Sequence, residues 1–357
     1  MTTQDLERAH APSGDRALSD MRMQGDKLVF LEVGRAVAAL IVVLHHADQA
    51  TAHFSDIARE RLFMWGQYGV DFFFVLSGFI IFYTHRNDGY GGAHAQLYAF
   101  KRVSRIYIPY LPVALAYMGL LLVFQHGPLS ERPWSLWATF TLLPSEKSST
   151  LTVAWTLTYE LIFYAFFLLA FVSRRALLAA SVIWSLYLLA VLSGHVARPD
   201  SAAFAALSDP IILEFFCGAL AAWLFVRVPA RMRWGILASG LALLGLVIMF
   251  WSGERALLGP PLALIVLAAA MTPYRSPDRV TDFLIFLGAA SYAIYLVHSP
   301  VVSILARVLQ PLDNRLVIFV ACALIGTALG VVYHLLFERP ALRGAQRFRP
   351  VLRSAGA

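Results

Sequence analysis

Two residues that could do chemistry stand eleven positions apart in an apolar segment near the start of the chain, Arg35 and His46. Eleven residues of α-helix rise about 16 Å and make close to three turns, so both side chains lie on one face. His45 points about 100° away from His46. A cation at one end of this face and an imidazole deeper along it suit an anionic ligand whose reactive end reaches inward. Alternatively, each side chain only extends to the nearer water interface.

Three carboxylates also lie inside apolar segments: Asp71, Glu160 and Glu214. An ionisable group in such a segment is costly unless it is paired or hydrated, so each one is a functional candidate. Asp71 is expected at the depth of His46, where a carboxylate can hold an imidazole in one tautomer. Glu160, among aromatic neighbours, could share a proton or pair with Arg35 or a histidine. For each residue, a structural pair that fixes helix register is the alternative.

A basic cluster, KRVSRIY, contains Lys101, Arg102 and Arg105. Arg102 and Arg105 are three positions apart and therefore neighbours on a helix. Guanidinium groups pair well with phosphate, so the two arginines could form a phosphate clamp. The alternative is that they only mark the cytoplasmic end of a membrane helix, where basic residues collect.

Ser291, Tyr295 and His298 follow i, i+4 and i+7 spacing and share a helix face. Glu338 and Arg339, in the string FERP at 337–340, are expected to end a helix rather than to form a site.

Small residues are expected to serve packing. Ser77 and Gly78 in one apolar segment, and Gly326 and Gly330 in another, would let helices approach each other closely.

The elements that must position these residues are membrane helices. Of the 357 residues, 59% are hydrophobic and only 14% are charged, whereas a soluble chain carries about a quarter charged residues. Ten apolar segments are long enough to be considered as spans: 30–51, 67–84, 106–125, 151–172, 176–193, 211–226, 234–251, 256–272, 283–305 and 316–337. The weakest are 211–226, which is short, and 256–272, which contains Pro260 and Pro261. Continuous apolar runs indicate helices and not the alternating strands of a barrel.

The predicted fold is therefore an all-α polytopic membrane protein with about ten transmembrane helices in one bundle and no soluble domain. We expect a disordered cytoplasmic tail at 1–27, the membrane domain at 28–340 and a basic cytoplasmic tail at 341–357. Two cysteines lie inside apolar segments and no metal-ligand spacing occurs, so no metal site is expected.

The 29 Lys and Arg residues indicate the orientation of the bundle. Twenty of them fall in the two tails and the alternate connections that share their side, and eight fall in the other connections. Because basic residues favour the cytoplasmic side, both termini are expected in the cytoplasm. This distribution also explains the positive net charge without nucleic acid as a partner; membrane lipids are the expected surroundings.

In order, these segments resemble the membrane acyltransferase family 3, and its exopolysaccharide-modifying branch in particular. The resemblance covers about residues 28 to 340. It is carried by R-x10-H from Arg35 to His46, GVDFFFVLSGFI at 69–80, RVSR at 102–105, AWTLTYELIFY at 154–164, PIILEFFCG at 210–218, LGAASYAIYLVHSP at 287–300 and FERP at 337–340.

The resemblance implies transfer of an acyl group, usually acetyl from acetyl-CoA, to a hydroxyl of a glycan or lipid-linked sugar. By this likeness His46 is the catalytic histidine and Arg35 the essential arginine of the same motif. Arg102 and Arg105 match the arginines expected to contact the CoA phosphates. Acidic positions of the family motifs are occupied by Asp71, Glu160 and Glu214.

The resulting hypothesis is that acyl-CoA, a co-substrate and not a tightly bound cofactor, enters from the cytoplasm and is held by Arg35, Arg102 and Arg105. His46 acts as general base on the acceptor hydroxyl; an acyl-histidine intermediate is the alternative. Further site residues are expected to be Asp71 and Glu160 for catalysis and Glu214, Tyr295 and His298 for substrate binding. The rival hypothesis is a transporter or flippase for an envelope sugar or acyl donor, with the buried charges as a proton relay.

Overall fold

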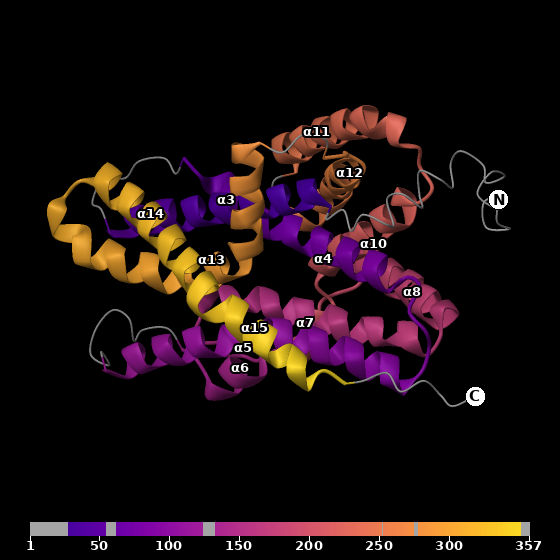
Figure 1. The fold of residues 1–357 in the computed structure, drawn as a ribbon, viewed down its shortest axis with the longest axis horizontal. Coiled ribbons are helices and arrows are strands. Elements are labelled where there is room, and N and C mark those ends of the chain that lie inside the picture. Colours follow the sequence, from indigo (N-terminus) through magenta and orange to yellow (C-terminus); the bar gives the residue numbers. More distant parts are fainter. Residues whose placement is uncertain (1–27, 55–61, 124–132, 252, 275–277, 351–357) are drawn as a thin grey trace, which may run out of the picture.

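The computed structural model describes residues 28–54, 62–123, 133–251, 253–274 and 278–350, and in these ranges the chain forms a bundle of helices (Figure 1). Nine helices of the described part are long and apolar enough to cross a membrane, and a shorter apolar helix spans Arg255–Ala270. The prediction of an all-α polytopic membrane protein is confirmed. The tail predicted at 1–27 and the last seven residues of the tail predicted at 341–357 lie outside the described residues.

The long helices correspond to the apolar segments of the sequence. They are α3 (Val29–Phe54), α4 (Gly69–His85), α5 (Gly92–Val123), α7 (Trp155–Phe167), α8 (Arg174–Leu192), α10 (Leu213–Phe225), α11 (Arg233–Phe250), α13 (Arg279–Leu309) and α14 (Arg315–Tyr333). The short helices are α6 (Leu136–Thr141), α9 (Ala202–Leu207), α12 (Gly259–Ala270) and α15 (Arg339–Ala345).

Local sequence explains where several of these helices begin. The side chains of Ser173, Asp278 and Asn314 cap α8, α13 and α14 by accepting hydrogen bonds from backbone amides of the first turn. Pro260 and Pro261, which made the eighth apolar segment look weak, lie in the first turn of α12. Amides at that position have no partner inside the helix, so proline is tolerated there.

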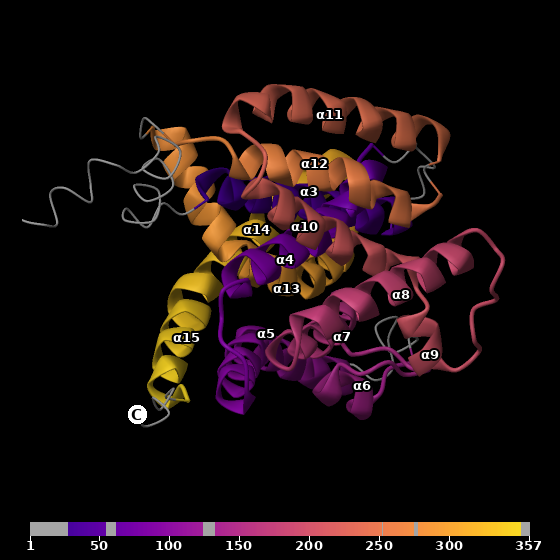
Figure 2. The same cartoon turned by 90° about the vertical axis from the view of Figure 1, so that its right-hand side faces the viewer.

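The helices form two groups that lie side by side (Figure 2). One group contains α3, α4 and α10 to α14, in which α13 packs along both α3 and α14 and α4 packs on α10. The other contains α5 to α9. A Cβ atom added at Gly218 of α10 would lie 1.8 Å from the carbonyl oxygen of Val75. Glycine therefore lets the backbones of α10 and α4 touch, and Gly78 does the same from the α4 side, as predicted.

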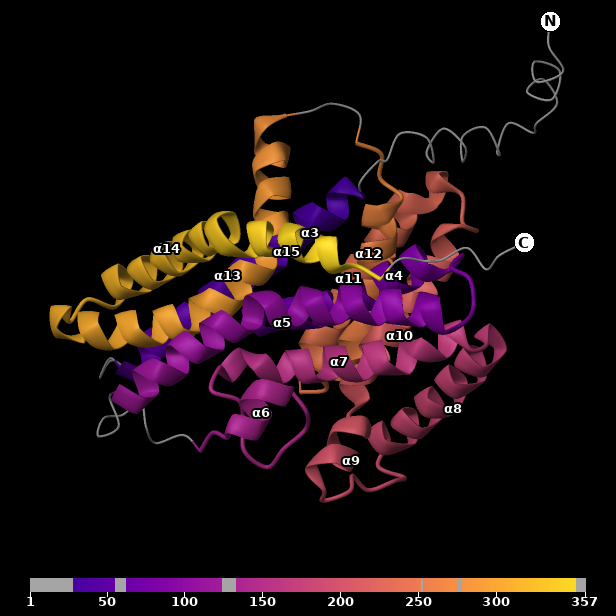
Figure 3. The ribbon, with the colours of Figure 1, turned by 60° about the horizontal axis from the view of Figure 1, so that its bottom comes forward.

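The chain does not end its last long helix at FERP. After α14 it passes through one π-helical turn, η8 (His334–Glu338), and continues as α15, which lies along α5 (Figure 3). The predicted stop is wrong because Pro340 falls in the first turn of α15, where its missing amide hydrogen costs little.

Candidate active site

A cavity of about 180 Å³ lies where α3, α4, α5, α7 and α13 meet, between the two groups of helices. It brings together five of the residues predicted to act in catalysis or binding: Arg35, Arg102, Arg105, Glu160 and Tyr295. Four aromatic side chains also line it, Phe73, Phe74, Tyr164 and Tyr292. The cavity is smaller than the roughly 300 Å³ at which pockets for drug-sized ligands begin. It can therefore enclose a narrow part of a ligand, while a bulky part would remain outside.

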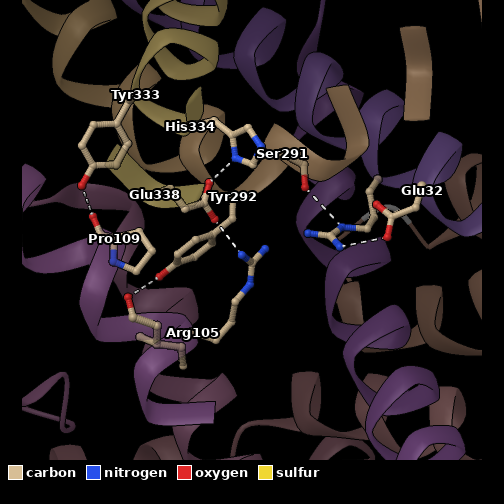
Figure 4. A network of polar contacts seen from close by, with 10 residues as sticks. Glu32, Arg105, Pro109, Ser291, Tyr292, Tyr333, His334 and Glu338 are labelled. Atoms are coloured by element: carbon tan, nitrogen blue, oxygen red, sulfur yellow. Dashed lines mark hydrogen bonds and ion pairs between the residues drawn. The ribbon is translucent and has the colours of Figure 1, made fainter. Parts of the chain in front are cut away.

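Arg35 extends from α3 toward α13. Its Nε donates a hydrogen bond to Ser291 Oγ at 3.2 Å, and its Nη1 lies 3.4 Å from a carboxylate oxygen of Glu32 (Figure 4). The second carboxylate oxygen of Glu32 is buried and has no hydrogen-bond partner among the described residues. Arg35 is thus held at the cavity wall with part of its hydrogen-bonding capacity left over, since a guanidinium has five N–H groups.

Arg105 is tied to the π-helical turn. Its Nη1 donates to Glu338 at 2.7 Å, and the other carboxylate oxygen of Glu338 lies 2.7 Å from His334 Nδ1 (Figure 4). The guanidinium also lies over the ring of Tyr292, 5.3 Å from its centre. Glu338 is completely buried and holds Arg105 beside the cavity. This role of Glu338 was not predicted from the sequence, although His334 and Glu338 stand four positions apart and so face the same way on a helix.

Arg102 carries an unsatisfied donor. Its Nη2 donates to His85 Nε2 at 2.9 Å, and His85 in turn donates from Nδ1 to Asp88 at 2.7 Å. The Nε of Arg102 is buried and has no hydrogen-bond partner in the part of the chain that the structure describes. An unpaired buried N–H on a cation is costly, and an anionic oxygen would satisfy it. The residue types and this open donor therefore fit a phosphate.

Glu160 accepts hydrogen bonds from the hydroxyl groups of Ser77, at 3.3 Å, and Tyr164. The pairing of Glu160 with Arg35 or a histidine, one of the two alternatives for this residue, does not occur among the described contacts. The packing role predicted for Ser77 is also incomplete, because Ser77 lines the cavity and its hydroxyl joins α4 to α7 through Glu160. Glu160 is half-buried, so hydroxyl donors together with partial exposure can satisfy its carboxylate in place of a cation.

His46 lies next to His298, with His46 Nδ1 3.1 Å from His298 Nε2 and their ring centres 5.0 Å apart. Arg35 and His46 therefore both contact α13, through Ser291 and His298, and the predicted shared face is confirmed. Among the described residues His46 is not part of the cavity lining. Tyr295 connects the two places: it lines the cavity, and its ring centre lies 5.8 Å from that of His298.

Asp71 does not orient His46. Its two carboxylate oxygens accept hydrogen bonds from Arg255 at 3.1 and 2.7 Å, and Glu214 lies fully buried against it. A buried carboxylate needs a compensating charge, which a guanidinium supplies through two parallel bonds and a neutral imidazole does not. Arg255 also lies over Trp155, 5.4 Å from the ring centre. The predicted contact between Glu214 and substrate stays a prediction, because Glu214 lies outside the described cavity lining.

Comparison with known proteins agrees with this picture. The family model described as an acyltransferase domain matches residues 28–335. The "Exopolysaccharide production protein ExoZ" of Rhizobium meliloti (strain 1021) is 28% identical over 335 residues, which cover 88% of this chain and 99% of that protein. No solved structure matches the chain. The family match spans all five helices that enclose the arginine-lined cavity, and the chain belongs to this family of membrane acyltransferases.

Proposed function

We propose that this protein transfers an acyl group from an acyl-CoA thioester to a hydroxyl group of an exopolysaccharide or its lipid-linked precursor. The observation that carries the proposal is the cavity lined by Arg35, Arg102 and Arg105, in which Arg102 Nε has no partner among the described residues. The acceptor class is inferred from the printed name of the relative from Rhizobium meliloti. Membership of an acyltransferase family favours this enzyme over the transporter hypothesis.

The size of the cavity supports a binding mode in which two parts of the acyl-CoA donor lie in different places. At about 180 Å³ the space suits the slender thioester arm of acyl-CoA. The nucleotide, which is larger and carries the phosphates, would stay at the mouth, where Arg102 and Arg105 offer their donors. Guanidinium forks match phosphate oxygens in geometry as well as in charge.

His46 is the proposed general base. It would accept the proton of the acceptor hydroxyl while that oxygen bonds to the thioester carbonyl carbon. The protonated His46 would then return this proton to the sulfur as the C–S bond breaks, so that an ester and a free thiol form. Arg35, on the same face, would hold the negatively charged part of the donor. Formation of an acyl-histidine on His46 is the alternative route.

The proposal requires the reactive end of the donor to pass Tyr295 to reach His46. The hydroxyl group of Tyr295 lies 3.0 Å from Thr156 Oγ1 and donates a hydrogen bond to the carbonyl oxygen of Val153, also at 3.0 Å. Because Tyr295 lines the cavity and contacts His298, a modest movement of this ring would join the cavity to the histidine pair.

Purified protein in lipid nanodiscs, supplied with acetyl-CoA and glycan from a deletion strain, tests the proposal by mass spectrometry of the glycan. We expect His46→Ala to abolish acetylation. Arg102→Gln should raise the KM for acetyl-CoA about 10- to 100-fold, the value of one or two lost bonds to a charged group, and leave the KM for acceptor unchanged. Arg175→Gln, an exposed arginine of α8, is the matched control. No acetylation by the wild-type protein would reject the proposed reaction. Full activity of His46→Ala would reject the role of His46 as general base, and equal effects of the two arginine variants would reject the phosphate contact of Arg102.

We also propose that both termini face the cytoplasm of a bacterial inner membrane, which would place Arg102 and Arg105 on the side where acyl-CoA is made. The excess of basic residues on one side of the bundle supports this orientation. Reporter domains fused to each end test it: a reporter active only in the periplasm should stay inactive at both termini.

A further inference from the structure

The two neighbouring histidines have a defined hydrogen-bond order. His298 Nδ1 lies 3.0 Å from the carbonyl oxygen of Ile294, which can only accept, so His298 Nδ1 carries a hydrogen and donates it. His298 is completely buried. In a neutral imidazole with its hydrogen on Nδ1, Nε2 has a lone pair and accepts. His298 Nε2 therefore presents an acceptor to His46.

The same reasoning shows which ring nitrogen of His46 carries the hydrogen. Its Nδ1 lies 3.1 Å from the carbonyl oxygen of Val42 and 3.1 Å from His298 Nε2. Both neighbours are acceptors, so the hydrogen of His46 must be on Nδ1, shared between them. The other nitrogen, Nε2, is then left without a hydrogen and is the basic one. A hydrogen on His298 Nε2 would point at the N–H of His46, which is unfavourable.

We propose that His298 is a positioning residue that fixes His46 as the tautomer whose Nε2 is basic, and so takes the part that a carboxylate takes in many hydrolase triads. This inference rests on the proposed function of His46. It replaces the earlier expectation that His298 contacts substrate. A neutral imidazole suits this buried site better than a carboxylate would. The charge of a carboxylate would have to be buried beside neutral His46 without a counter-ion among the described residues around the pair.

The packing around His298 is suited to hold one ring orientation. Gly326 of α14 lies against it: a Cβ atom added at Gly326 would be 3.5 Å from His298 Cβ, an ordinary contact. On the other side the ring meets Tyr295 and His46. α13, which carries His298, packs against both α3 and α14, so the residue lies between two neighbouring helices.

Three substitutions separate positioning from packing. His298→Gln places a carbonyl oxygen near the former Nε2, so it can still accept from His46. His298→Asn can still donate to Ile294 but is too short to reach His46. His298→Phe keeps the volume of the ring and loses both bonds. We expect kcat to fall at least about tenfold in the Asn and Phe variants, with the KM for acetyl-CoA unchanged and most of kcat recovered in the Gln variant. Gly326→Ala is the packing control and should stay active.

Nitrogen-15 NMR of histidine-labelled protein in lipid gives a readout that needs no activity. Wild-type His46, assigned by its loss in His46→Ala, should show a protonated Nδ1 and an unprotonated Nε2. In His298→Asn the signals should indicate a mixture of tautomers. A protonated Nε2 in the wild type overturns the inference even if no variant folds. Wild-type kcat in the Asn and Phe variants, or a Gln variant as slow as Phe, also overturns it.

The two proposals can fail separately. If His46→Ala is inactive while His298 variants behave as wild type, His298 has no positioning role and the proposed function stands. If His46→Ala is active, the role proposed for His46 is wrong, and the positioning role of His298 fails with it.

Discussion

Arg255, in the connection between α11 and α12, holds both carboxylate oxygens of Asp71 on α4 at 3.1 and 2.7 Å. Asp71 is fully buried and the Arg255 side chain is 29% exposed. A second acid, Glu214, lies against Asp71. The Arg255 guanidinium therefore supplies the counter-charge for buried Asp71 beside a second buried acid, which makes this residue part of the structural core of the membrane domain.

We expect Arg255→Gln to destabilise the protein by about 3–5 kcal/mol, because it leaves Asp71 buried without a counter-ion. Thermal denaturation in detergent measures the loss. Asp71→Asn combined with Arg255→Gln should recover part of the stability, since the uncompensated charge is then removed. Arg231→Gln, at an exposed arginine, is the control. Equal stability of the two single arginine variants would contradict this account.

Glu338→Gln tests whether the ion pair between Glu338 and Arg105 holds the guanidinium in place. The substitution keeps the shape of the side chain and removes the charge that holds the guanidinium 2.7 Å away. We expect the KM for acyl-CoA to rise several-fold with little change in kcat, because Arg105 would lose its fixed position and keep its charge. Steady-state kinetics in nanodiscs measures both constants, with Glu146→Gln, at an exposed glutamate, as control. A lower KM would mean instead that Glu338 competes with the donor phosphates.

Gly330→Ala tests the contact between α13 and α14. A Cβ atom at Gly330 would lie 2.5 Å from Ile294 Cα, a backbone atom that cannot move aside without shifting the helix. We expect a loss of about 1–3 kcal/mol from overpacking, measured by thermal denaturation. Gly245→Ala in α11 is the matched control, because nothing lies within 4 Å of its added Cβ and alanine favours helix. If both variants were equally stable, this contact would not be tight.

Asp278, which caps α13 outside the membrane segments, is expected to make the stability of the protein depend on pH in the acid range. Hydrogen bonds from the hydroxyl and amide of Thr281 lower the pKa of its carboxyl group. A lowered pKa means that the stabilisation is complete above about 3.9, the ordinary value for aspartate, and is lost as the pH falls through the folded pKa. Asp278→Asn, which can still cap, should weaken this acid dependence in denaturation curves from pH 6 to about 3. If Asp278→Asn left the pH dependence of stability unchanged, that dependence would come from groups other than Asp278.

Much of the site within single helices could be predicted from the sequence. The spacing of Arg35 and His46, and of Arg102 and Arg105, determines which side chains share a face, because both members of each pair lie on one helix. Hydropathy located the apolar helices for the same reason: each crossing is a local property of about 20 residues.

The partners across helices could not be predicted. Arg255 and Asp71 are 184 positions apart, and Arg105 and Glu338 are 233 positions apart. Their pairing depends on how helices pack, which periodicity does not determine. The sequence predicts a packing role for Ser77 beside Gly78, whereas its hydroxyl donates to Glu160 of α7, a helix from elsewhere in the chain.

The π-helical turn at His334–Glu338 determines which side of α15, the helix that follows it, faces α5. Such a turn holds one residue more than an α-helical turn, and one residue corresponds to a rotation of about 100°. Deleting a single residue here would swing α15 around its own axis and carry its inner surface away from α5. Homologous chains with a one-residue gap at this point would therefore present a different set of side chains beside the arginines.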